Sequence, residues 1–167
     1  MNNTYQVAGH RFSVSGENLC KAVESIDGFD TFRIDGGETL FSFVEGREVP
    51  EMKHLQYEFS YEDIIGVFGK TTEGFLLSLK PQDEESLNLW HNNDEKEVAI
   101  SGNMSARLYR FALWIGLGLM LVPYNTVAIH SSCIVYRDEA VLFLGESGTG
   151  KAPTRDYGER TSTAHSS

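Results

Sequence analysis

The sequence predicts an α+β fold, in which a β-rich N-terminal region is followed by one buried helix and then by a β-hairpin that leads into a glycine-rich loop. Three observations predict it. Short apolar and aromatic runs separated by turn residues fill the first hundred residues, one long apolar run spans 111–122, and two further apolar runs end at Gly145. A chain of 167 residues, 41% hydrophobic and 11% aromatic, suffices for one compact core and part of another domain.

The N-terminal region is expected to form short strands joined by turns. Its strand-like segments alternate apolar with polar residues or are rich in aromatic residues. A short helix is predicted over 19–26, because apolar residues recur there at helical spacing. The acidic segment 82–97 is interpreted as a solvated loop and an edge strand. The expected strands lie within 5–16, 39–46, 55–62 and 66–81, with a turn at Thr72–Gly74 in the last.

The long apolar run predicts a helix over 105–122 that the core surrounds on most sides. Asn103 or Ser105 is the candidate N-cap, and Pro123 ends the helix. The uninterrupted apolar stretch of 111–122 falls short of the ~20 residues that a membrane-spanning helix needs. The run is therefore assigned to a buried helix.

Four residues of this helix need an explanation. Gly116 and Gly118 lower helix propensity, so they are expected to allow close packing against a neighbouring element. Arg107 and Arg110 lie near the start of the helix, where its dipole disfavours cations. They either pair with partners elsewhere in the chain or face the solvent.

Charge and cysteine content exclude several classes of protein. A formal net charge of -10 without a basic cluster argues against nucleic-acid and anionic membrane partners. Cys20 and Cys133 form neither a CxxC motif nor a Cys/His cluster, so no metal site is predicted and both thiols are expected to be packed. The N-terminus lacks the pattern of a signal peptide. A reduced, cytoplasmic setting fits these features.

After the helix, two strands are predicted within 126–136 and 140–145, joined at Arg137-Asp138-Glu139. The second strand runs directly into Gly145, four residues, Gly150 and Lys151, which is the spacing of a P-loop. In such a loop the glycines let backbone N–H groups turn toward a polyphosphate, and the lysine ammonium reaches the outer phosphates. The loop therefore predicts nucleotide binding.

The stretch VAIHSSCIVYRDEAVLFLGESGTGK resembles the nucleotide loop of the HPr kinase/phosphorylase group, within the phosphoenolpyruvate carboxykinase-like superfamily. The resemblance implies ATP and Mg²⁺ as cofactors and transfer of the ATP γ-phosphate to a hydroxyl of a protein or small molecule. It implies a catalytic role near the phosphates for His130, although a lone histidine in a strand is more often a core residue. The phosphate-binding residues that it implies are Gly145, Ser147, Gly148, Thr149, Gly150 and Lys151.

The sequence departs from this family after Lys151. Relatives continue with a Ser or Thr hydroxyl for Mg²⁺, a helix and acidic metal ligands, whereas this chain has Ala152 and Pro153. One codon choice for residues 151–167, read one base out of frame, restores Ser-Thr and an amphipathic helix. We therefore expect a frameshift after Lys151, with residues 152–167 forming an aberrant disordered tail.

The predicted organisation is a β-rich domain over 1–100, then the helix and first strands of a kinase-like nucleotide domain over 101–151. The leading interpretation is a truncated, ATP-binding kinase-like protein that is catalytically incompetent and binds nucleotide weakly, with ATP and Mg²⁺ serving its intact relatives. Its uncovered apolar surface predicts a protein partner or self-association. The alternative is a non-enzymatic binding module that carries a vestigial glycine loop. A small, complete phosphate-binding protein is a weaker third interpretation.

Overall fold

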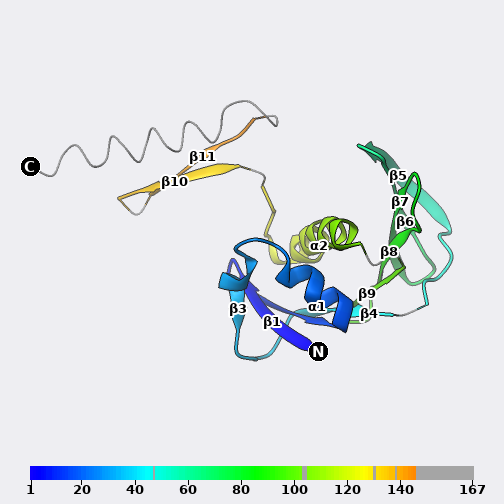
Figure 1. The fold of residues 1–167 in the computed structure, drawn as a ribbon, viewed down its shortest axis with the longest axis horizontal. Coiled ribbons are helices and arrows are strands. Elements are labelled where there is room, and N and C mark those ends of the chain that lie inside the picture. Colours follow the sequence, from blue (N-terminus) through cyan, green and yellow to red (C-terminus); the bar gives the residue numbers. More distant parts are fainter. Residues whose placement is uncertain (47, 103–104, 130, 138, 146–167) are drawn as a thin grey trace, which may run out of the picture. The chain divides into compact units, whose positions relative to one another are not determined.

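The computed structural model describes residues 1–46, 48–102, 105–129, 131–137 and 139–145. The chain divides into two compact units, Met1–Asn125 and Thr126–Ser167. The first unit combines a large sheet with two α-helices (Figure 1). The described chain is thus mixed α and β with strands predominating, which agrees with the predicted α+β class at that level.

Nine strands form one sheet in the described part of the first unit, in the order β3-β1-β2-β4-β9-β8-β7-β6-β5. The neighbours β2, β4 and β9 run parallel, and the other pairs are antiparallel. The strands are β1 (Asn2–Val7), β2 (His10–Ser15), β3 (Arg33–Ile34), β4 (Phe41–Glu45), β5 (His54–Tyr61), β6 (Ile64–Lys70), β7 (Gly74–Pro81), β8 (Leu87–Asn92) and β9 (Glu97–Gly102).

Turn chemistry explains several of these strand boundaries. Ala8 and Gly9 both have positive φ, 50° and 81°, and they form the two-residue connection of the β1–β2 hairpin. The predicted turn before Gly74 is confirmed, because β6 ends at Lys70 and β7 begins at Gly74. There the Thr71 hydroxyl accepts a hydrogen bond from the Gly74 N–H at 3.0 Å, so the side chain fixes the reversal.

Helix α1 (Glu17–Glu24) follows β2, and the short 3₁₀ helix η1 (Phe29–Phe32) then leads to β3. The short helix predicted over 19–26 is confirmed, but it begins two residues earlier and ends at Glu24, so that Ile26 lies beyond it and is only partly buried. Leu19, Cys20, Ala22 and Val23 are buried, and they pack into the same core as β2 and β4. Ser25 caps the last turn, where its N–H donates to the Lys21 carbonyl at 3.1 Å.

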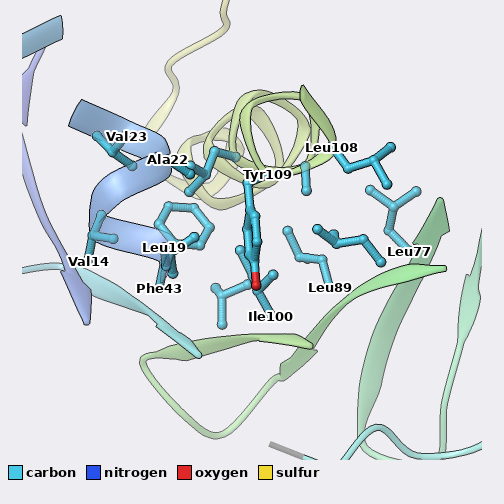
Figure 2. Packing of buried hydrophobic residues seen from close by; sticks show 14 of the residues in the cluster. Val14, Leu19, Ala22, Val23, Phe43, Leu77, Leu89, Ile100, Leu108 and Tyr109 are labelled. Carbon is cyan, nitrogen blue, oxygen red and sulfur yellow. The ribbon is translucent and has the colours of Figure 1, made fainter. Parts of the chain in front are cut away.

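Helix α2 (Ala106–Leu121), followed by the 3₁₀ helix η2 (Val122–Tyr124), lies on the same face of the sheet as α1 (Figure 1). Tyr109 extends from α2 toward the sheet, among Phe43, Leu89 and Ile100 (Figure 2). These four side chains are almost fully buried. Desolvation raises the pKa of Tyr109 to about 12, with a smaller contribution from the negative charge of Glu45. The two helices and the sheet therefore share one core.

The prediction that the core surrounds α2 on most sides is wrong. Five of its six buried residues, from Leu108 to Gly116, recur at helical spacing and mark a single face, whereas Trp114 is 55% exposed. The reason is the architecture of the first unit, in which the two helices form one layer over one face of the sheet. By length and composition alone, Ala106–Tyr124 could cross a membrane, a test that core helices of soluble proteins also pass. Packing of α2 on the sheet argues for the core helix.

The prediction of an edge strand within 82–97 is also wrong. Strand β8 lies between β7 and β9 in the interior of the sheet, and Leu87 and Leu89 are fully buried. The acidic residues that suggested a solvated segment gather in the connections on either side of β8. Leu87, Leu89 and His91 alternate with less buried residues and point toward the core. This alternation allows β8 to be a central strand, because a central strand of such a sheet needs only one apolar face.

Candidate functional site

The candidate site follows a β-hairpin in the second unit. Strands β10 (Ser132–Tyr136) and β11 (Glu139–Phe143) pair antiparallel, from Ser132 opposite Phe143 to Tyr136 opposite Glu139. Arg137 in the connection has a φ of 48°, as a tight hairpin requires. The predicted hairpin is therefore confirmed, although the described first strand begins at Ser132 and the described residues before it are not in a strand.

Strand β11 ends at Phe143 and delivers the chain to Leu144 and Gly145, both exposed. Gly145 is the first residue of the predicted phosphate loop. The predicted loop therefore begins two residues after the end of β11, at an exposed position. The other predicted phosphate-binding residues lie outside the described residues, as do His130 and the tail 152–167. They are Ser147, Gly148, Thr149, Gly150 and Lys151. Their predicted roles stay predictions.

The hairpin exposes apolar side chains. Val135 is 70% exposed and Leu144 67% exposed, and Val141 and Leu142 are about half exposed. In strand β10, Cys133 is exposed, so the expectation that both thiols are packed holds only for Cys20. A two-stranded ribbon has no second layer of its own to bury a side chain, which explains the exposure of Cys133.

The sequence left open whether the two arginines near the start of α2 pair with other residues or face the solvent. Arg107 donates from Nη2 to both carboxylate oxygens of Asp63, at 2.8 Å each, and its Nη1 lies 3.6 Å from Glu62. The guanidinium of Arg110 lies over the Trp114 ring, 5.6 Å from the ring centroid. Arg107 thus has acidic partners far away in the sequence, and Arg110 contacts its own helix.

Sequence reasoning missed a small aromatic cleft beside these arginines. It has a volume of about 160 Å³ and lies between the β5–β6 turn and α2. Tyr61 and Phe111 stack at its wall, with ring centroids 5.5 Å apart, and Trp114 also lines it. Fifty positions separate Tyr61 from Phe111 in the sequence, so no local pattern could have joined them.

Among the residues that the structure describes, no three His, Cys, Asp or Glu side chains gather as potential metal ligands. No family model, curated protein or solved structure matches this chain. The family resemblance consequently rests on the sequence of the stretch from Val127 to Lys151 alone.

Proposed function

We propose that the loop from Gly145 to Lys151 binds the phosphates of a nucleotide, and that the chain is a kinase-like protein that does not transfer a phosphoryl group. One observation carries the proposal: the Gly-x4-Gly-Lys spacing follows directly on a strand, β11. Because β11 ends two residues before Gly145, the strand anchors the start of the loop whose backbone N–H groups would bind the phosphates. That is the context in which such a motif grips phosphate.

Loss of catalysis follows from the residues after the lysine. Ala152 stands where a P-loop has the hydroxyl that holds Mg²⁺, and Pro153 removes a backbone N–H from the next turn. Phosphoryl transfer needs positioned phosphates, a bound metal and a group that orients the nucleophile. Residues 145–151 supply at most the first of these. In the intact relatives that the motif resembles, ATP and Mg²⁺ would complete the set and a hydroxyl would accept the phosphate.

Titration of the purified chain with ATP, with and without Mg²⁺, tests this proposal. The missing hydroxyl and the Mg²⁺ that it would hold each contribute on the order of 1 kcal/mol or more, and ~1.4 kcal/mol changes affinity tenfold. We expect a dissociation constant no tighter than roughly 1 mM, little effect of Mg²⁺ and no γ-phosphate transfer. The amide resonance of Gly145 should shift with ATP in NMR spectra.

Lys151→Ala should abolish the ATP-dependent shift, whereas Lys70→Ala, at an exposed lysine of β6, should leave it unchanged. Micromolar, Mg²⁺-dependent binding with turnover would contradict the loss of catalysis. Binding that survives Lys151→Ala would contradict the assignment of the loop itself.

A second candidate function, a non-enzymatic binding module, is favoured by the edge strand β5. Among the described strands, this eight-residue strand has a neighbour on one side only, and Leu55, Tyr57 and Tyr61 are each more than half exposed. Exposed aromatic residues on an open strand edge are typical of surfaces that accept a protein partner or a second copy. Sedimentation velocity over a range of concentrations tests self-association, which Tyr57→Lys should abolish. A monomer at all concentrations that also captures no partner would argue against this candidate.

A further inference from the structure

A polar cleft of about 540 Å³ opens at the amino ends of the three parallel strands of the first unit. Arg11 is the second residue of β2, Leu40 precedes β4 and Lys96 precedes β9. The main chain ties the three starts together, since Leu40 N–H donates to the Arg11 carbonyl and Ser42 N–H to the Lys96 carbonyl, both at 2.8 Å. The lining side chains are therefore attached to a frame of ladder hydrogen bonds.

The guanidinium of Arg11 is held in place from one side. Its Nε donates to Gln6 Oε1 at 2.9 Å. Gly37 packs against it so closely that a Cβ at position 37 would lie 2.7 Å from Nη1. Among the described residues no group accepts a hydrogen bond from the terminal nitrogens of Arg11. The terminal N–H groups of the Arg11 guanidinium are therefore suited to bind an oxyanion through two parallel hydrogen bonds.

The charges in the cleft oppose those of the chain as a whole. Arg11 and Lys96 line it together with a single carboxylate, Glu38, in a chain whose formal net charge is -10. Neither the Lys96 ammonium nor the Glu38 carboxylate has an ion-pair partner among the described residues. The rings of His10 and Tyr124 form one wall, with centroids 5.8 Å apart. A local excess of cations on an acidic protein favours an anionic ligand.

We propose that this cleft binds a small phosphate monoester of about the size of a sugar phosphate. The phosphate dianion would accept hydrogen bonds from the guanidinium of Arg11 and would be attracted by the positive charge of the Lys96 ammonium. Glu38 and the Thr39 hydroxyl would receive hydrogen bonds from the hydroxyl groups of the sugar. Sites for small molecules commonly enclose about 300–1,000 Å³, and the cleft falls within that range.

Amide NMR with glucose 6-phosphate, inorganic phosphate and glucose as probes, at constant ionic strength, tests the proposal on the full chain. We expect glucose 6-phosphate to shift the resonances of Gly9, Arg11 Nε and Thr39 in a saturable manner, and glucose to shift none of them. Arg11→Gln should weaken this binding by about tenfold or more, because it removes the charged guanidinium. Lys80→Gln, at an exposed lysine of β7, is the matched control and should change nothing.

The remaining variants separate this site from the glycine loop and from non-specific attraction. Glu38→Gln should weaken glucose 6-phosphate more than inorganic phosphate, which lacks the sugar hydroxyls. Lys151→Ala should leave the shifts at Gly9 and Thr39 unchanged, even if it removes the response of Gly145. The proposal is overturned if the shifts appear only near Gly145, if Arg11→Gln has the same effect as Lys80→Gln, or if no probe saturates. Preference for a carboxylate such as malonate over glucose 6-phosphate would also overturn it.

Discussion

The carboxylate of Glu45, at the end of β4, accepts hydrogen bonds from Asn18 in the first turn of α1. Oε2 lies 3.1 Å from the Asn18 backbone N, and Oε1 lies 2.6 Å from Asn18 Nδ2. Oε2 also lies 3.3 Å from the backbone N of Leu19. The N-cap residue, Gly16, has no side chain to do this, and a Cβ there would lie 2.4 Å from Glu45. A strand thus supplies the cap of a helix that begins 28 positions earlier.

Glu45→Ala should lower the free energy of unfolding by about 1–2 kcal/mol, as the loss of an N-cap does. Urea denaturation followed by circular dichroism measures the change. Glu51→Ala is the control, because its carboxylate pairs with the nearby Lys53 at the surface. The control should change stability by less than about 0.5 kcal/mol. Equal losses in both variants would show that Glu45 does not act as a cap.

Two glycines of α2 should respond in opposite directions to alanine. A Cβ on Gly118 meets nothing within 4 Å, so Gly118→Ala should stabilise the protein by about 0.5–1 kcal/mol through helix propensity. A Cβ on Gly116 would lie 2.6 Å from Leu89 and 2.9 Å from Phe43, both fully buried. Overpacking costs about 1–3 kcal/mol, which exceeds the propensity gain, so Gly116→Ala should destabilise. Thermal melts of the two variants measure both signs, and stabilisation by Gly116→Ala would contradict the packing.

The pair of Arg107 and Asp63 predicts a dependence on pH. The hydrogen bonds from Arg107 hold the pKa of the Asp63 carboxyl below its ordinary value. Stability from this interaction is therefore present above the ordinary pKa of Asp63 and is lost as the pH falls through the lowered pKa of the folded state. Arg107→Gln should lower the melting temperature by a few degrees at most at pH 7, since the pair is at the surface. The difference should shrink as the pH falls through the lowered pKa of Asp63 and the carboxyl becomes protonated.

An NMR titration of the Asp63 carboxyl checks the cause of this dependence. In Arg107→Gln its pKa should rise toward the ordinary value of about 3.9. Arg110→Gln is the matched control one turn later along the chain, since its guanidinium contacts Trp114. An unchanged pKa in Arg107→Gln would refute the assigned cause.

The two thiols should differ in reactivity. Cys20 is fully buried, its Sγ lies 3.3 Å from the Val14 carbonyl, and burial raises the pKa of its thiol. Cys133 is exposed in β10. Iodoacetamide at neutral pH should modify Cys133 alone in the folded protein, and both cysteines in urea, as mass spectrometry of tryptic peptides would reveal. Labelling of Cys20 at the rate of Cys133 without urea would show that the α1 core is open.

The sequence by itself determined the local features of this protein. Helix α1 and most strands followed from periodicity, because spacing of apolar residues decides which face a segment can bury. The end of α2 before Pro123 and the hairpin around Arg137 followed from turn and breaker residues. The glycine loop also comes from sequence alone, and its function stays a prediction because 146–151 lie outside the described residues.

Only the tertiary structure decided which segments become neighbours. Strand β9 pairs with β4, which places β8 in the interior of the sheet although its flanks are acidic. The same pairing brings Arg11 and Lys96 to one cleft, and the meander that follows β5 brings Asp63 to Arg107. Helix α2, which the sequence analysis assigned to the kinase-like region over 101–151, packs on the sheet of the first unit. Periodicity specifies a buried face but not the partner that buries it, since partner choice depends on the sum of contacts distant along the chain.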